Sequence, residues 1–196
     1  MTPSWTGKLL LLSCLLTGLA ACAEDLGREW QALDAETSKI VFGAPGLETQ
    51  KVRFLRSYDG GQSVMIESGS WVGPEARHAK AVVLYLRASP GYYLVYRTDD
   101  PQELLKYFEG LKDKPITFGP LETAVNDLGR VQHRSFGFEG VNCVIFLQIL
   151  GGGGAGGDRG SGSAGEQQVI GYYCADPGQP LEKPLIRQVV ASIDIR

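Results

Sequence analysis

Residues 141–150 read VNCVIFLQIL and residues 167–174 read QQVIGYYC, with a glycine-rich tract between them. Both runs are short and rich in β-branched and aromatic residues, which predicts two β-strands rather than helices. The intervening residues 151–166 include nine glycines. That composition is typical of a flexible loop. We therefore expect a long β-hairpin whose loop is dispensable for folding.

Two cysteines of this hairpin fall into register. Folding the two runs about the tract places Ile149 opposite Gln168 and, counted backwards, Cys143 opposite Cys174. Directly opposed residues of an antiparallel pair lie close to the Cα separation that a disulfide needs, so we predict a disulfide here. Two buried free thiols would leave the registration unexplained. A metal site would lack further ligands, because the chain has two histidines and no Cys-x-x-Cys.

The first 21 residues have the pattern of an export signal. Lys8 ends a short basic region, and residues 9–21 form an apolar run that suits a signal peptide and is too short to span a membrane. The run ends in Leu19-Ala20-Ala21-Cys22, which resembles the lipobox of bacterial lipoprotein precursors. The resemblance implies that residues 1–21 are removed and that Cys22 becomes the lipidated N-terminus. Cleavage by an ordinary signal peptidase after Ala23 is the alternative.

The lipobox resemblance also implies a location. An Ala after the lipidated cysteine, here Ala23, is compatible with the outer membrane. We therefore expect an exported cell-envelope protein anchored to the outer membrane and facing the periplasm, with the membrane and an envelope protein as its partners. Ordinary cleavage would give a soluble periplasmic or secreted protein instead. Both compartments are oxidising, which favours the predicted disulfide.

The composition indicates one ordinary globular domain. The chain is 43% hydrophobic and 21% charged, with a formal net charge of −3 and no basic cluster, which argues against a nucleic-acid partner. After residue 22 no run approaches 18 consecutive apolar residues, so no membrane-spanning helix is expected. We place the domain at residues 49–196. Before it, residues 22–48 form a tether in which Leu26, Trp30 and Leu33 predict a short amphipathic helix.

The domain alternates strand-like runs with turn signals and contains two helix signals. Asp100 and Pro101 mark the start of the first helix, whose apolar stripe is Leu104, Leu105, Phe108 and Leu111, with Gly110 as a stop signal. Apolar residues from Leu185 to Ile193 follow one face of the second. We predict an α+β fold, an antiparallel sheet of about eight strands with both helices packed on one face. The expected strands lie at 51–56, 63–67, 81–86, 92–96, 123–125, 131–136, 141–150 and 167–174.

The two halves of the domain share the same order of turn and helix signals. Gly91-Tyr92-Tyr93 and Gly171-Tyr172-Tyr173 each close a predicted hairpin, and each is followed by an Asp-Pro and a helix. This order indicates a duplicated ββββα unit, with halves at residues 49–114 and 115–196. Tyr93 and Tyr173 are then expected at equivalent positions. Chance repetition of a three-residue motif is the alternative.

No motif in the chain indicates a particular reaction. The glycine tract lacks the Gly-Lys-Ser/Thr ending of a phosphate-binding loop and leads into a strand. His78 and His133 are isolated, and there is no Gly-x-Ser-x-Gly or Ser-x-x-Lys. The carboxylates show no spacing that indicates acid–base work. We therefore predict no catalytic residue, no metal and no cofactor.

Strand aromatics are the remaining candidates for a binding surface. Because alternate strand residues face opposite ways, some of them could form an aromatic strip that contacts a ligand or partner. Ordinary core positions are the alternative. We expect a lipid-anchored envelope protein with a binding or structural, non-catalytic role. The alternatives are a periplasmic hydrolase using His133 and a secreted soluble binding protein. The candidate contact residues are Trp71, Tyr85, Tyr92, Tyr96 and Tyr172.

Overall fold

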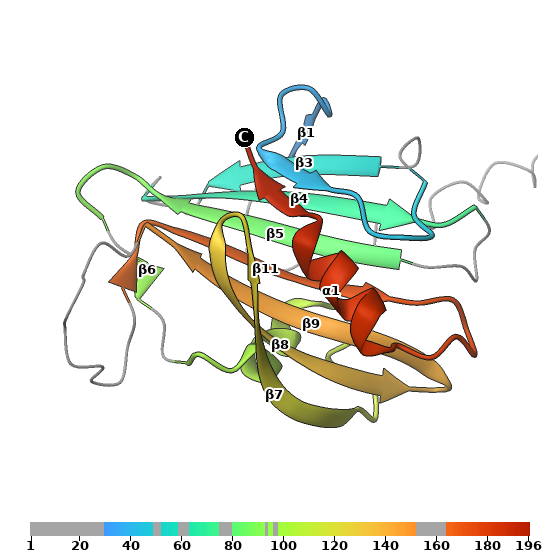
Figure 1. Ribbon diagram of the computed structural model, residues 1–196. Helices are drawn as coiled ribbons and strands as arrows, with labels where there is room; N and C mark the ends of the chain where they lie inside the picture. Colours follow the sequence, from blue (N-terminus) through green and yellow to red (C-terminus); the bar gives the residue numbers. More distant parts are fainter. Residues whose placement is uncertain are drawn as a thin grey trace, which may run out of the picture.

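An eight-stranded antiparallel sheet forms the centre of the computed structural model, which describes residues 30–48, 52–58, 63–74, 80–92, 94–95, 98–151 and 164–196 (Figure 1). Two further pairs of short strands and two helices complete it, so the predicted α+β class and the eight-stranded sheet are confirmed. In spatial order the sheet contains β1 (Gln31–Leu33), β3 (Val52–Tyr58), β4 (Val64–Val72), β5 (Lys80–Ala88), β11 (Gln167–Cys174), β9 (Val141–Leu150), β8 (Gly129–Phe138) and β7 (Thr117–Asn126). The short pairs are β2 (Ile40–Phe42) with β12 (Ile193–Ile195) and β6 (Leu94–Val95) with β10 (Ala164–Gly165). The helices are the 3₁₀ helix η1 (Pro101–Tyr107) and α1 (Lys183–Ala191).

The β9–β11 hairpin has the predicted register. Gln168 pairs with Ile149, and Cys174 pairs with Cys143, whose sulfur atoms are bonded. Seven of the eight residues of β11 are buried, because this strand lies at the centre of the sheet and both of its faces are covered. Within the glycine tract, residues 152–163 lie outside the described residues, so their predicted dispensability stays a prediction. Residues 164–165 form β10.

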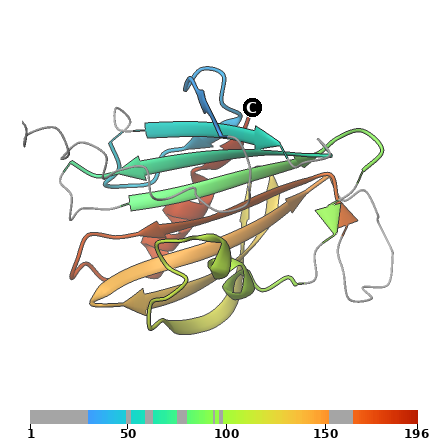
Figure 2. The same cartoon turned by 180° about the vertical axis from the view of Figure 1, so that it is seen from behind.

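The two helices lie on opposite faces of the sheet, so the prediction that they share one face is wrong. Figure 1 shows α1 in front of the sheet, and Figure 2, seen from behind, shows η1 in front. On β9, Val144 and Phe146 pack with α1, whereas Ile145 and Leu147 pack with η1. Successive residues of a strand point to opposite faces, and this strand is apolar on both, so each face needs its own cover. We call these the α1 face and the η1 face.

The first helix is shorter than predicted, but its start is as predicted. The Asp100 carboxylate accepts a hydrogen bond from the backbone N–H of Gln102 at 3.0 Å, and Pro101 occupies the first turn. The backbone N–H of Phe108 donates to the Leu105 carbonyl, and Phe108 itself is extended, so the helix ends there. The remaining apolar residue of the expected stripe, Leu111, is fully buried beyond the helix.

The segment before residue 49 belongs partly to the domain. Gln31–Leu33 forms edge strand β1 on β3, so the helix expected over Leu26, Trp30 and Leu33 is wrong where the chain is described. Ile40 and Phe42 of β2 are buried in the core of the α1 face. The backbone N–H and C=O groups of β1 and β2 form hydrogen bonds with β3 and β12. This strand pairing outweighs the weak helical periodicity of the segment. Residues 1–29 lie outside the described residues.

The two Gly-Tyr-Tyr motifs are not equivalent, so the repeat defined by them is wrong. Gly91 has a φ of +88° in the turn after β5, where a residue without Cβ is favoured. Gly171 lies in the middle of β11, and a Cβ there would come within 2.5 Å of the Phe146 ring. The fourth strand on the first side of the sheet is β1, because β6 pairs with β10 outside the sheet. Tyr93 lies outside the described residues.

Candidate functional site

The predicted aromatic residues do not form one strip. Trp71 and Tyr85 are buried in the core of the α1 face, whereas Tyr172 is buried on the η1 face against Phe108. Tyr92 is 57% exposed in the turn after β5. The alternative interpretation, ordinary core residues, therefore fits the three buried ones. Cys22, Tyr96 and His78 lie outside the described residues.

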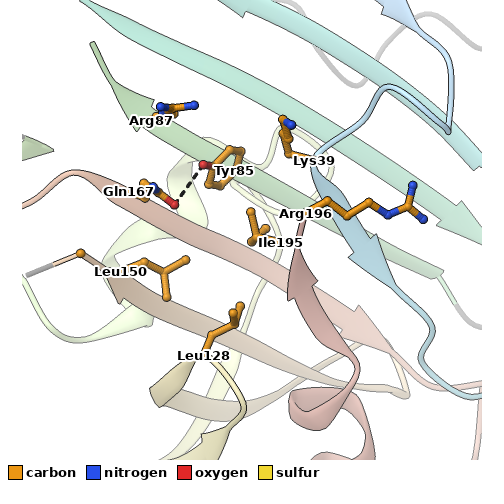
Figure 3. Close-up of a pocket in the computed structure, with 9 residues that line it drawn as sticks. Lys39, Tyr85, Arg87, Leu128, Leu150, Gln167, Ile195 and Arg196 are labelled. Carbon is orange, nitrogen blue, oxygen red and sulfur yellow. Dashed lines mark hydrogen bonds between the residues drawn. The ribbon is translucent and has the colours of Figure 1, made fainter. Parts of the chain in front are cut away.

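A pocket of about 400 Å³ opens on the α1 face beside Tyr85. It lies where β5, β11 and β9 approach the end of β12 and the β7–β8 turn (Figure 3). We call it the cationic pocket. Its lining residues are Lys39, Tyr85, Arg87, Leu128, Leu150, Gly151, Gln167, Ile195 and Arg196.

Positive charge dominates the lining of the cationic pocket. Lys39, Arg87 and Arg196 are exposed, and no acidic side chain is among the lining residues. None of the three forms an ion pair with another side chain in the described part of the chain. Figure 3 shows Lys39 and Arg87 on either side of the Tyr85 ring, whereas the side chain of Arg196 extends away from the centre. Lys39 and Arg87 are therefore the two cations whose side chains flank the Tyr85 ring in the pocket.

The wall opposite these cations is apolar. Leu128, Leu150 and Ile195 are half-buried, and Figure 3 shows their side chains converging on the space below Tyr85. The Tyr85 hydroxyl donates a hydrogen bond to the Gln167 amide oxygen at 3.0 Å. Burial raises the pKa of Tyr85, against the opposing effect of the Arg87 charge, so the phenol stays neutral and keeps its proton. The pocket thus combines a cationic rim with an apolar floor.

A buried carboxylate fixes the backbone of Lys39. Glu67 on β4 is fully buried and accepts hydrogen bonds from the backbone N–H of Lys39 at 2.8 Å and from the Ser38 hydroxyl at 3.2 Å. Its other oxygen accepts from Nε of Arg56 at 3.1 Å, so its charge is compensated within the protein. The Lys39 carbonyl accepts from the backbone N–H of Arg196 at 2.9 Å. Both backbone groups of Lys39 are therefore held, and its side chain is left for the pocket.

A second hollow of about 540 Å³ lies between β7, β8 and α1, and we call it the histidine pocket. His133 on β8 is 4% exposed and pairs with Glu122 on β7 across the strands. Burial lowers the pKa of His133, with Glu122 opposing this effect and Lys183 adding to it, so the imidazole is neutral near pH 7. The lining residues are Glu122, Thr123, Ala124, Val125, His133, Lys183, Ile186 and Arg187.

The charges of the histidine pocket compensate one another in part. Lys183 forms an ion pair with Glu122 at 3.4 Å across the opening. His133 Nδ1 is buried and has no hydrogen-bond partner among the described residues. Neither Ser nor Cys lines the hollow, and the Thr123 hydroxyl donates to Gln132 at 2.8 Å. The arrangement thus brings His133 beside a carboxylate and does not provide a serine or cysteine nucleophile.

The residues of the cationic pocket were missed by the sequence analysis. Its charged residues come from three distant segments and carry no local motif, and Tyr85 alone was among the predicted contacts. In the described part of the chain, no group of three His, Cys, Asp or Glu side chains is placed to hold a metal ion, and no helix is long and apolar enough to cross a membrane. Comparison with protein-family models, curated proteins and solved structures finds no match for this chain. The chemistry that the cationic pocket offers is attraction and hydrogen bonding of an anion.

Proposed function

We propose that the protein is a lipid-anchored protein of the cell envelope that binds a small anionic ligand in the cationic pocket and does no chemistry on it. The observation that carries the binding role is the set of cations, Lys39, Arg87 and Arg196, without an acidic side chain in the lining. Exposed cations without a carboxylate partner also occur elsewhere in the described chain, as at Arg53 and Arg130, but at the cationic pocket three of them line one hollow. Cations left without a carboxylate partner can bind an external anion.

The physics of the rim favours a carboxylate or a phosphate. A guanidinium offers a planar fork of N–H donors that matches two oxygens of either group, and Arg87 supplies it here. Lys39 adds a mobile point charge on the other side of Tyr85. Both side chains are exposed, so salt should weaken the attraction.

The location half of the proposal rests on two features. The disulfide between Cys143 and Cys174 fits an oxidising, exported location. The resemblance of Leu19-Ala20-Ala21-Cys22 to a lipobox supports lipidation at Cys22, an outer-membrane anchor and a domain in the periplasm. The membrane is then a partner through the lipid, and an envelope protein is a further candidate partner. A secreted or soluble periplasmic binding protein would use the same pocket without the anchor.

Calorimetric titration of the mature domain with inorganic phosphate and with butyrate tests the binding role. Wild-type protein should bind at least one of the two anions at low ionic strength, and Lys39→Gln/Arg87→Gln should weaken binding at least tenfold, or about 1.4 kcal/mol. The matched control is Lys183→Gln/Arg187→Gln, which removes the same net charge at the histidine pocket. Its affinity should stay within twofold of wild type. Equal losses in both variants would mean that net charge, and not the cationic pocket, attracts the anion.

Membrane fractionation of Cys22→Ser tests the anchor. The variant should move from the membrane to the soluble fraction and keep its fold, because the lipid is attached outside the domain. Intact mass of the mature wild-type protein should show the lipid on Cys22. A wild-type mass without lipid would leave export by ordinary cleavage and would reject the anchor.

The histidine pocket supports a second candidate, a hydrolase. The specific observation is that neutral His133 faces a hollow with Glu122 directly beside it, an arrangement in which imidazole can take a proton from an attacking water. Hydrolysis of 4-nitrophenyl acetate by the wild type, lost in both His133→Gln and Glu122→Gln, would support this reading. Equal rates in wild type and His133→Gln would reject it.

A further inference from the structure

We infer that the ligand of the cationic pocket is a free amphipathic monoanion, with one anionic head group and a short apolar chain. This inference rests on the proposed anion-binding function and specifies its ligand class. It is carried by the two walls of the pocket, which differ in chemistry and lie on either side of the same hollow (Figure 3).

The head group has a defined set of donors. Lys39 and Arg87 flank the Tyr85 ring and supply the charge. The Gln167 amide oxygen is occupied by the Tyr85 hydroxyl at 3.0 Å, which turns the amide N–H groups away from that bond. Gln167 Nε2 has no hydrogen-bond partner among the described residues, so it is a neutral donor beside the two charged ones. An anionic head group can take its hydrogen bonds from these donors around the Tyr85 ring.

The tail has a surface to lie on. Leu128, Leu150 and Ile195 come from the β7–β8 turn, the end of β9 and β12, and all three remain half-exposed. A bare inorganic anion at the rim would leave this surface in water, whereas an alkyl chain would cover it. The hollow of about 400 Å³ lies within the range of pockets that hold small organic molecules.

The chain should contribute to affinity in proportion to its length. Full burial of one methylene corresponds to about a fourfold gain in affinity, the equivalent of roughly 0.8 kcal/mol. Because the floor is only half-buried, we expect a two- to threefold gain for each methylene added. The gain should stop once the chain extends past the three apolar side chains.

A length series of carboxylates tests the inference. Acetate, butyrate, hexanoate and octanoate are titrated into the mature domain beside inorganic phosphate, with hexylammonium as the charge-reversed control. Wild-type affinity should rise along the series, and hexylammonium should not bind. Lys39→Gln/Arg87→Gln should lower the affinity for every carboxylate by a similar factor.

A floor variant separates the tail from the head. Leu128→Gln should flatten the dependence on chain length, so that the ratio of octanoate affinity to acetate affinity falls toward one. The matched control is Leu121→Gln, which makes the same change at a 41% exposed leucine outside both pockets, and it should retain the length dependence. Circular dichroism of both variants should match wild type, because neither leucine is fully buried.

The outcomes separate the proposed anion-binding function from the inferred ligand class. If no anion binds, the proposed function fails and the ligand class fails with it. If phosphate and all carboxylates bind equally, the anion site stands and the amphipathic ligand is rejected. Vesicles of phosphatidylglycerol form the last arm, because a lipid also combines a negative head with an apolar tail. Binding of the vesicles without binding of octanoate would overturn the assignment of a free ligand.

Discussion

The two faces of the sheet are both apolar, but they are covered by different elements. On the η1 face, the cluster around Ile145 and Ile170 is closed by η1 and by the Cys143–Cys174 disulfide. The α1 face has a comparable apolar cluster, but the buried carboxylate of Glu67 and the buried imidazole of His133 also project from it. Both pockets open on this second face. The cationic pocket, the histidine pocket and the proposed function therefore lie on the α1 face.

The arrangement of the covering elements explains this difference. The segment from α1 to β12 crosses the α1 face (Figure 1), and one pocket lies at each of its ends. The histidine pocket lies beside the first half of α1, at Lys183, Ile186 and Arg187, and the cationic pocket lies at the end of β12, at Ile195 and Arg196. Changes to the lining of the two pockets should therefore alter binding, whereas changes to the buried groups of either face should alter stability.

Removal of the disulfide on the η1 face should have the largest effect on stability. Cys143 and Cys174 are 31 residues apart, and a cross-link over such a loop removes roughly 3–4 kcal/mol of closure entropy from the unfolded chain. Cys143→Ala/Cys174→Ala should therefore fold with a clearly lower denaturation midpoint in urea, because the apolar pattern is unchanged. Its anion affinity should equal that of wild type, since the disulfide lies on the other face.

Reductant provides the control for the disulfide. It should lower the midpoint of wild type by about the same amount and leave the double variant unchanged. Equal wild-type midpoints with and without reductant would show that the bond does not constrain the unfolded chain under these conditions.

A change at Glu67 should have the next largest effect, on the α1 face. Glu67→Gln leaves the Arg56 guanidinium without its carboxylate partner in a partly buried position. We expect a loss of about 2–3 kcal/mol, below the range for fully buried pairs because Arg56 is 24% exposed and water can reach it. Urea denaturation measures the loss. Anion affinity should not fall in this variant, because the amide oxygen can still accept from the Lys39 N–H and a negative charge near the pocket is removed.

An apolar replacement of the pair sharpens this test. Arg56→Met/Glu67→Leu removes both charges, so it should recover part of the stability lost in Glu67→Gln. It also removes the acceptor of the Lys39 N–H, which Glu67→Gln retains, so anion affinity should fall in this variant. Anion affinity equal to that of wild type would contradict a positioning role for Glu67.

The features of the fold that could be predicted from the sequence are those that depend on the two-residue period of a strand. The register of Ile149 with Gln168 and of Cys143 with Cys174 could be counted from the glycine tract, because a slip of one residue would reverse every side chain. Counting residues could not show on which face of the sheet each helix packs. β9 and β11 are apolar on both sides, and such strands do not indicate which side a helix covers.

The cationic pocket was beyond prediction for a related reason. Lys39, Arg87 and Arg196 are isolated in the sequence, and they meet because β2 pairs with β12 and because β5 lies beside β11. The β2 segment was expected to be a tether, so its lysine had no predicted neighbours. Gly171 was also misinterpreted from its local sequence. The Gly-Tyr-Tyr motif that it shares with Gly91 indicated a repeat, but the role of Gly171 is its close contact with Phe146, which depends on tertiary packing that the sequence does not reveal.

The smallest effect should come from His133, and it should depend on pH. In the unfolded chain a histidine takes up a proton near pH 6.5, whereas burial lowers the pKa of His133 in the folded protein. Below about pH 6.5 the unfolded state therefore binds more protons than the folded state. Stability should fall as the pH decreases from 7 toward 5, by less than either change described above. Urea midpoints of wild type and His133→Gln across this range measure the effect, and the variant should lose this part of the slope.

Three further variants make the assignment to His133 specific. His78→Gln removes the other histidine of the chain and should keep the wild-type slope. Glu122→Gln removes the carboxylate that raises the pKa of His133, so the folded protein would resist protonation more strongly and the slope should become steeper. Lys183→Gln removes the charge that lowers this pKa and should make the slope shallower. Identical slopes in wild type and His133→Gln would mean that burial does not lower the pKa of His133 in the folded protein. The contrast between ionisable groups buried on the α1 face and uncharged polar groups buried on the η1 face would then not hold at this residue.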